Sequence, residues 1–284
     1  MKILMWRRVV SGVRPRHRRH DKIRSSMANR AKRTTPKISG PFLRHISALP
    51  DHVDPSRYPF NISAFSHGID IEITSNVTFF VGENGSGKST LFEAIARNSG
   101  FGAEGGSRDH QFARHRDRSD LASALRLSWL PKVTDGFFMR AESFYNFASY
   151  IENSGSDFGR YGGRSLHDQS HGESFLALFS NRFDRGIYIL DEPEAALSPQ
   201  RQLSFLSIIH RLETAGRAQF LVSTHSPIIL AYPGALLLSL DSDAIRQVHY
   251  TDTDHYRLTK QFLISPERYF RHLFSKDSDD GGET

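Results

Sequence analysis

The sequence predicts an α/β protein: a mostly parallel sheet flanked by helices, with an antiparallel β part and a short helical lobe. Short, uninterrupted apolar runs alternate along the chain with longer segments whose apolar residues recur at helical spacing. Such runs are typical of parallel strands, which are covered on both faces. Strands that alternate with helices are in turn typical of a parallel sheet whose crossover connections are helical.

The first elements follow a proline-rich leading segment. Prolines at 36, 41, 50, 55 and 59 indicate that this segment is irregular. The runs FNISAF and GIDIEI then alternate apolar and polar residues on either side of 66–68, which predicts a β-hairpin. The run VTFFV at 77–81 predicts a buried strand, and residues 90–98 predict a helix directly after it.

The second half of the chain repeats this alternation. Residues 99–120 are rich in glycine and charge, which indicates a surface loop. The strands expected after it are ALRLSWL and GFFMRA with a turn between them, then GIYIL, AQFLVSTH, GALLLSL and IRQVHY. The helices expected are ESFYNFASYIEN, ESFLALFSNRF, 198–216 and one around 257–274, and a glycine-rich linker is expected at 153–165.

Charge divides the chain into three expected parts. Residues 1–40 hold thirteen Lys or Arg and one acid, Asp21, so the net charge of +6 belongs to this segment. We expect it to be a basic, disordered extension, with 41–274 as the folded domain, the helical lobe at about 141–180, and 275–284 as an acidic tail. Three interpretations of the extension stay open: a tail, with Met27 as the true start; an arm that binds nucleic acid or anionic lipid; and a transit peptide.

Composition excludes several classes of site. The chain has no cysteine, which rules out disulfides, thiol nucleophiles and thiolate metal sites and fits a cytoplasmic protein. No apolar run approaches the ~18 residues of a membrane-spanning helix. The opening MKILMWRRVV is too short and too charged for a secretory signal. We therefore expect a soluble, cytoplasmic protein.

A phosphate-binding loop follows the strand 77–81. The pattern G-x-x-x-x-G-K-[ST] is met by Gly82, Glu83, Asn84, Gly85, Ser86, Gly87, Lys88 and Ser89, with Thr90 beside them. Glycines let successive backbone N–H groups turn inward around a phosphate, and the next helix adds the positive end of its dipole. Lys88 supplies a charge to the β- and γ-phosphates, and the Ser89 hydroxyl is a candidate ligand of Mg²⁺. This sequence of strand, loop and helix predicts the P-loop NTPase fold.

Two further strands end in polar residues that suit nucleotide hydrolysis. The strand IYIL is followed by Asp191 and Glu192, at the edge where open α/β sheets bind ligands. Asp191 is the candidate metal-ordering acid. Glu192, expected to point the other way on an extended chain, is the candidate that polarises the attacking water. After FLVST, His225 is the candidate that contacts the γ-phosphate.

These three motifs together resemble the ATP-binding-cassette (ABC) ATPases, in their stand-alone, SMC-like branch of AAA-type ATPases. The segments FFVGENGSGKSTL, GFFMRAESFYN, QSHGESF and ILDEPEAALSPQRQ are similar to a bacterial group of small ATPases of that branch. The resemblance covers about residues 58–240. It implies a signature loop, here Ser170, His171, Gly172 and Glu173, that closes over ATP held by a second copy. Ser170 and the following helix N-terminus would donate to the γ-phosphate.

The chain departs from that family at two positions. His171 stands where the family has a second glycine, and Ser198 stands where it has a dimer-contact aspartate. Ser198 is also expected to be an N-cap before Pro199 at the first helical position. Both departures bear on how strongly two copies would close around ATP.

Three further sites of the family have only candidates in this chain. No glutamine marks its Mg²⁺-sensing loop: Gln111 comes too early, and Arg140 or Glu142 would substitute unless their role is structural. Tyr58 and Phe65 are candidates to stack on adenine. His167 and His171 have the spacing of a zinc pair, but lie on the signature loop without a third ligand, which favours a role beside phosphate.

The predicted protein is therefore an ATPase that hydrolyses ATP to ADP and phosphate with Mg²⁺. Catalysis is assigned to Glu192, His225 and Lys88, and metal binding to Ser89 and Asp191. We expect an ATP-sandwich dimer that drives a conformational change in a partner. The alternatives are the ATP-binding subunit of a membrane transporter, and a DNA-repair or defence ATPase that binds nucleic acid through the basic extension or loop 99–118. A small-molecule P-loop kinase is disfavoured by the Asp191-Glu192 pair, the signature loop and His225.

Overall fold

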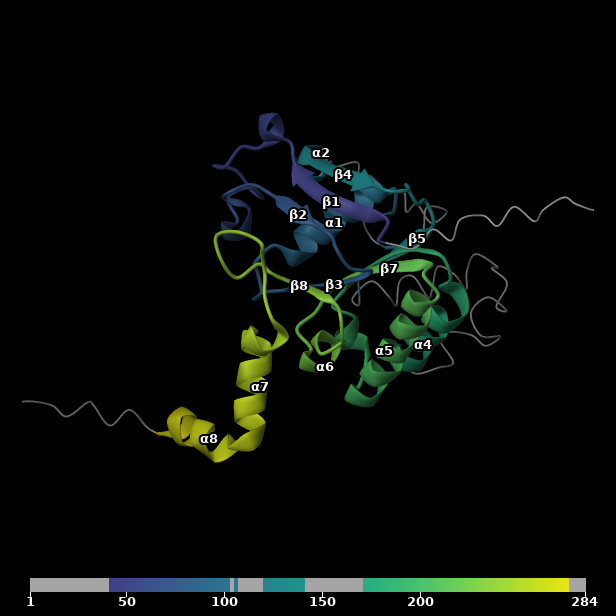
Figure 1. Ribbon diagram of the computed structural model, residues 1–284. Coiled ribbons are helices and arrows are strands. Elements are labelled where there is room, and N and C mark those ends of the chain that lie inside the picture. The colour runs from purple at the N-terminus through teal and green to yellow at the C-terminus, as the bar shows by residue number, and fades with distance from the viewer. Residues whose placement is uncertain (1–40, 103–104, 107–119, 141–170, 276–284) are drawn as a thin grey trace, which may run out of the picture. The chain divides into compact units, whose positions relative to one another are not determined.

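The computed structural model describes residues 41–102, 105–106, 120–140 and 171–275 (Figure 1). All of these residues belong to one compact unit. Several predicted features lie outside the described residues: the extension 1–40, most of the loop 99–120, the helical-lobe residues 141–170, and the tail beyond 275. None of the helices in the described ranges has the length and apolar character needed to cross a bilayer.

The main sheet has six strands, in the order β5-β6-β7-β3-β8-β9. Its strands, in that order, are Gly136–Arg140, Gly186–Asp191, Ala218–Ser223, Val77–Val81, Leu236–Ser239 and Arg246–Gln247. The first five are parallel to one another, and β9 pairs with β8 in the antiparallel sense. The predicted α/β fold with a mostly parallel sheet is therefore confirmed.

A smaller antiparallel sheet has the order β2-β1-β4, made of Asp70–Glu72, Leu43–Ala48 and Leu125–Trp129. The described α-helices are α1 Lys88–Ser99, α2 Asp120–Ala124, α4 His171–Arg182, α5 Pro199–Thr214, α6 Pro227–Leu230, α7 Asp254–Ile264 and α8 Pro266–Phe274. Short 3-10 turns are η1 Pro50–His52, η2 Ser63–Phe65, η4 Pro193–Ala196 and η5 Tyr250–Asp252.

The main sheet separates two apolar cores, because successive side chains of a strand point to opposite faces. Tyr188 and Leu190 of β6 face the core that contains residues of α4 and α5. Ile187 and Ile189 of the same strand face the core that contains residues of α1 and the small sheet. Figure 1 shows α4 and α5 on one side of the main sheet and the small sheet on the other. Burial on both faces explains why the strands read as unbroken apolar runs.

Several sequence predictions about the elements are wrong. FNISAF is not a strand; it contains the turn η2, and β2 pairs instead with β1, in the leading segment that was expected to be irregular. β1 was missed because it contains Arg44, His45 and Ser47 and its register shifts between Leu43 and His45. The strands β4 and β5 belong to different sheets, and the helix expected at 257–274 is divided at Ser265.

A buried glutamine ties the small sheet to the main sheet. Gln219 of β7 has no exposed surface, and its Oε1 accepts from the backbone N–H of Phe42 at 2.9 Å and of Leu43 at 2.8 Å. Its Nε2 donates to the carbonyl of Leu43 at 2.9 Å. Buried polar groups need such partners, so this polar residue inside an apolar run fixes where β1 begins.

Candidate functional site

The register of the parallel strands brings the predicted motifs to one edge of the main sheet. Ser223 at the end of β7 pairs with Phe80 of β3 on one side and with Asp191 of β6 on the other. The phosphate-binding loop follows β3, Glu192 follows β6, and His225 follows β7 by two residues. All three therefore leave the sheet at the carboxyl ends of neighbouring strands, where open α/β sheets bind ligands.

The loop 82–87 has the backbone that an anion-binding turn requires. Gly87, the N-cap of α1, has φ +97°, in the left-handed region. A Cβ at this position would lie 2.8 Å from Cζ of the buried Phe65, so both conformation and space demand glycine there. The first N–H groups of α1 have no acceptor within the helix, and they face the loop that was predicted to hold phosphate.

Lys88 is buried at the start of α1, with 4% of its surface exposed. Its Nζ donates to the carbonyl oxygens of Gly82 at 2.6 Å and Glu83 at 3.0 Å. Burial lowers the pKa of Lys88, and nearby carboxylates, first those of Glu192 and Asp191, oppose that shift. An ammonium has three donors, so this geometry suits a lysine that braces the loop and also contacts an anion held by it.

Asp241, after β8, holds the loop from the other side. Its Oδ1 accepts from the backbone N–H of Glu83 at 2.6 Å, and Ser239 donates to its Oδ2 at 3.1 Å. The sequence analysis missed Asp241. Its signal was present, because Asp241 also follows a strand that ends at this edge of the sheet.

Asp191 has the environment expected of a metal-ordering carboxylate. The residue is 5% exposed, and its Oδ1 is buried and has no hydrogen-bond partner among the described residues. Burial raises its pKa, whereas Ser89, Arg140 and Ser223 act to lower it. A hard cation such as Mg²⁺ prefers carboxylate and hydroxyl oxygens, so Asp191 and Ser89 fit this ion. The described residues hold no cluster of three or more His or acidic side chains suited to a metal, so phosphate oxygens and water would complete its coordination.

Arg140 lies against the same carboxylate. Its Nε is 3.5 Å from Oδ2 of Asp191, and its Nη2 is 3.4 Å from Oε2 of Glu93 on α1. Arg140 ends β5, directly opposite Asp191 in the register. Of the two candidates to replace the missing glutamine, Arg140 therefore lies at Asp191, and Glu142 is outside the described part of the chain.

Glu192 corrects one detail of the prediction. Its backbone is left-handed, with φ 52° and ψ 54°, not extended. It is the only non-glycine residue with positive φ among those described, a kind of strain that persists where surrounding contacts enforce it. Its N–H donates to the carbonyl of Ser223 at 2.9 Å, and its Oε1 lies 3.4 Å from Nε2 of His225.

His225 is held on two sides. Its backbone N–H donates to Oε1 of Glu194 at 2.6 Å, and its Nδ1 is 2.6 Å from Nε2 of His255 on α7. Burial lowers the pKa of His225, and the charges of Lys88 and His255 lower it further, against an opposing effect of Glu192. The imidazole is therefore favoured in its neutral form. Sequence reasoning did not find His255 or Glu194.

A cavity of about 240 Å³ joins these elements, lined by Tyr58, Ile62, Asn84, Gly85, Gly87, Lys88, Ser89, Thr90 and Glu192. The exposed Tyr58 has its hydroxyl 3.0 Å from Oγ1 of Thr90. Phe65 is only 2% exposed and packs beneath Gly87. The suggestion that Phe65 stacks on adenine is therefore wrong, because its faces are buried; Tyr58 stays a candidate.

Comparison with known proteins agrees with this geometry. A family model described as "AAA domain, putative AbiEii toxin, Type IV TA system" matches residues 106–231, and one described as "AAA domain" matches residues 60–124. These matches include the Walker A loop, the Asp191-Glu192 pair and His225. Over residues 60–231 the chain is therefore similar to AAA-domain proteins, and it carries the P-loop motif within that stretch. No curated protein matches its sequence.

Solved structures of P-loop proteins are similar to this one at low sequence identity. The SMC head domain from Thermotoga maritima shares 18% identity, with a TM-score of 0.43, over 73% of this chain and 99% of that one. CbiO1 from Clostridium perfringens, part of the ABC transporter complex CbiONQ, shares 14%, with a TM-score of 0.43, over 82% and 100%. A nucleotide-free ATP-binding cassette from an ABC transporter shares 16%, with a TM-score of 0.43, over 79% and 97%.

In this P-loop protein the signature segment is described only from His171 onward, so Ser170 and His167 lie outside the described residues. The prediction that residues 171–173 belong to a loop is wrong, because they form the first turn of α4. A Cβ on Gly172 would lie 2.6 Å from Nη1 of Arg201. Oε1 of Glu173 accepts from Nη2 of Arg201 at 3.0 Å. The start of α4 is therefore fastened to α5 by Arg201.

Ser198 occupies the N-cap position of α5, before Pro199, as predicted. Its side chain makes no capping hydrogen bond, so the capping role is not borne out. Asn84, Ser86 and Thr90 lie in the loop and first turn as the motif requires, and the Ser86 hydroxyl is buried without a hydrogen-bond partner among the described residues.

Proposed function

We propose that this P-loop protein binds ATP with Mg²⁺ and hydrolyses it to ADP and phosphate in the cytoplasm. The observation that carries the proposal is Asp191: a buried carboxylate with a partnerless Oδ1, one strand away from Ser223 and two away from the phosphate-binding loop. A buried carboxylate oxygen without a hydrogen-bond partner is costly to retain, unless a cation completes it.

Each residue has a role that its position supports. The N–H groups of the loop 82–87 and Nζ of Lys88 hold the β- and γ-phosphates, with Asn84, Ser86 and Thr90 beside them. Bound Mg²⁺ would neutralise phosphate charge, held by the Ser89 hydroxyl and the Asp191 carboxylate. Most of the rate acceleration would come from positioning and charge stabilisation.

Glu192 is the residue proposed to activate water. Its carboxylate borders the cavity beside Lys88 and is partly exposed. It accepts a proton from the water whose oxygen attacks the γ-phosphorus, and the bond to the β,γ-bridging oxygen breaks, leaving its electron pair on ADP. Nε2 of His225, 3.4 Å from Glu192, donates to the γ-phosphate or the water. Glu192 then releases its proton to solvent.

The proposal includes two copies that close face to face around ATP, with residues 170–173 of one copy over the nucleotide of the other. Closure and opening would drive a conformational change in a partner. One matched family is that of a putative toxin of a type IV toxin–antitoxin system, which favours a defence role over a transporter subunit as the second candidate. Salt-dependent retention on DNA that is lost when residues 1–40 are deleted would support that candidate.

The test of the enzymatic proposal uses two variants and a control. We expect Glu192→Gln to keep ATP affinity, to lose hydrolysis by a factor of about 100 or more, and to accumulate a dimer with MgATP. We expect Lys88→Ala to lose ATP affinity itself. Glu72→Gln, on the exposed side of β2, is the matched charge control and should change neither property.

The measurements are phosphate release, calorimetric titration with MgATP, and light scattering with and without nucleotide. Phosphate release by Glu192→Gln at the wild-type rate would disprove the role of Glu192. An absence of binding heat with the wild-type chain would disprove the whole proposal.

A further inference from the structure

The imidazoles of His225 and His255 form the only direct histidine–histidine hydrogen bond in the described part of the chain. Nδ1 of His225 and Nε2 of His255 are 2.6 Å apart, and the ring centroids are 4.7 Å apart. The two residues are 30 positions apart in sequence. His225 follows β7, and His255 lies in the first turn of α7.

The contact leaves the other ring nitrogen of His225 facing the reaction site. Its Nε2 is buried and lies 3.4 Å from Oε1 of Glu192, which is long for a hydrogen bond, and it has no other partner among the described residues. In a neutral imidazole one nitrogen donates and the other accepts. The partner of Nδ1 therefore decides what Nε2 can do.

We propose that His255 is a positioning residue that donates its Nε2–H to Nδ1 of His225 and so keeps the proton of His225 on Nε2. This inference rests on the proposed ATPase function and assigns His255 a part in it. The opposite arrangement would put the proton on Nδ1 and turn the lone pair of Nε2 toward the Glu192 carboxylate, which is repulsive. With His255 as donor, Nε2–H of His225 points at Glu192 and at the site of the γ-phosphate.

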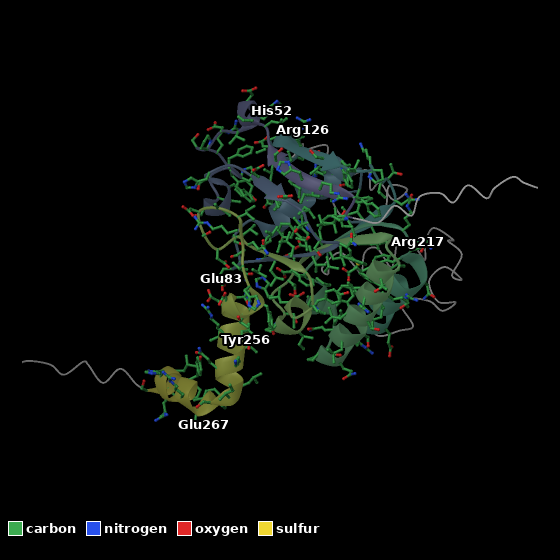
Figure 2. The ribbon with its side chains drawn as sticks, viewed as in Figure 1. His52, Glu83, Arg126, Arg217, Tyr256 and Glu267 are labelled. Carbon is green, nitrogen blue, oxygen red and sulfur yellow. The ribbon has the colours of Figure 1, made fainter. Side chains whose placement is uncertain are left out.

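The backbone around His255 is fixed to the same part of the molecule. Thr253, the N-cap of α7, is 5% exposed; its side chain accepts from the N–H of Tyr256 and donates to the carbonyl of Tyr250 at 2.8 Å. The Tyr250 hydroxyl donates to the carbonyl of Pro227 at 3.0 Å, in the helix that directly follows His225. Figure 1 shows α6 close to the upper end of α7, and Figure 2 labels Tyr256 there. His255 is therefore held at a set distance from His225.

The surroundings of His225 favour its neutral ring. The groups that face His225 are Glu192 after β6, Glu194 in η4, Lys88 in α1 and His255 in α7. Protonation of His225 would place a second N–H against the donor of His255, close to the Lys88 ammonium. Removal of His255 should therefore make His225 easier to protonate.

The direct test is the tautomer of His225, read by long-range ¹H–¹⁵N NMR of the full chain labelled at histidine, with His225 assigned by its loss in His225→Gln. In the wild type we expect the proton on Nε2. In His255→Ala we expect a mixture of tautomers and a raised pKa of His225. In His255→Gln, whose amide N–H₂ reaches a similar position, we expect the Nε2–H tautomer to return.

The kinetic test compares the same variants in MgATP hydrolysis. We expect His255→Ala to lower kcat roughly five- to tenfold, the worth of one hydrogen bond, with KM unchanged, and His255→Gln to recover most of it. The control is His52→Ala, which changes an exposed histidine of η1 that is distant in sequence from both His225 and His255. Its kcat and KM should match those of the wild type.

A wild-type His225 with its proton on Nδ1, or a tautomer unchanged in His255→Ala, would overturn the inference. So would an equal loss of kcat in His255→Ala and His255→Gln, because a donated hydrogen bond would then be irrelevant. If the wild type hydrolyses no ATP, the proposed function fails, and the NMR result still decides the arrangement of the pair.

Discussion

Substitution of Gly87 by alanine tests the predicted loop most sharply. Gly87 has φ +97°, and a Cβ there would lie 2.8 Å from Cζ of Phe65 and 3.3 Å from Cδ1 of Ile62. Phe65 is 2% exposed, so its ring cannot turn toward solvent. Gly87→Ala therefore combines backbone strain with steric overlap.

Two other glycines separate these effects. Gly85 in the same loop has φ +86°, and Gly234 outside the loop has φ +77°; a Cβ at either position meets nothing within 4 Å. A left-handed alanine costs about 1–2 kcal/mol, and an extra methyl group in a packed site adds about 1–3 kcal/mol. In all three variants alanine also lowers the conformational entropy of the unfolded chain, which stabilises the folded state by about 0.4–1 kcal/mol. The free energy of unfolding should therefore fall by about 0–1.6 kcal/mol for Gly85→Ala and Gly234→Ala, and by about 1–3 kcal/mol more for Gly87→Ala.

Urea unfolding of the three variants without nucleotide, with equal slopes, measures these differences. Titration with a fluorescent ATP analogue adds a second reading, in which Gly234→Ala should bind as the wild type does. Equal stability of Gly87→Ala and Gly85→Ala would refute the reasoning, because it would show that Phe65 does not confine Gly87.

Two further predictions concern stability. Gln219→Ala leaves the N–H groups of Phe42 and Leu43 without their acceptor, so urea unfolding should show a loss of at least about 2 kcal/mol, against almost none for the exposed Gln247→Ala. The pKa of His225 is lower in the folded chain than the value of ~6.5 expected in the unfolded chain. Between these two pKa values the unfolded chain binds more protons, so the free energy of unfolding should fall as the pH decreases through this window. In His225→Gln the fall should be shallower by the contribution of one proton, and an identical pH profile would show that His225 is not shifted.

Short runs of consecutive residues were sufficient to predict the central strands of the main sheet. The runs 77–81, 186–190 and 218–223 are buried on both faces, and such strands are recognisable because nearly all of their residues are apolar or small, with Gln219 as the exception. The Walker A loop was equally readable, since its chemistry depends on consecutive residues. The antiparallel sheet was predicted only in part. GIDIEI and ALRLSWL predicted the strands β2 and β4, but β1 was missed because few apolar residues mark it and two turns separate it from β2.

The backbone conformation of Glu192 was also not predictable from its neighbours in sequence. A strand that ends in two acids suggests an extended continuation, yet Glu192 turns left-handed because Pro193 begins η4 and the N–H of Glu192 still pairs with Ser223. The hydrogen bond to Ser223 comes from a neighbouring strand, and the residues next to Glu192 do not encode that contact.

By itself, the sequence determined the phosphate-binding loop, the parallel strands, and the identity of the acids and the histidine at their ends. Only the tertiary structure decided which distant groups hold them: His255 on His225, Asp241 on the N–H of Glu83, Arg140 on Asp191 and Gln219 on Leu43. The physical reason is the difference in sequence separation between the two kinds of interaction. Hydrophobic periodicity and turn chemistry act over a few neighbouring residues, whereas a hydrogen bond between residues 158 or 176 positions apart exists only once the sheet has set its register.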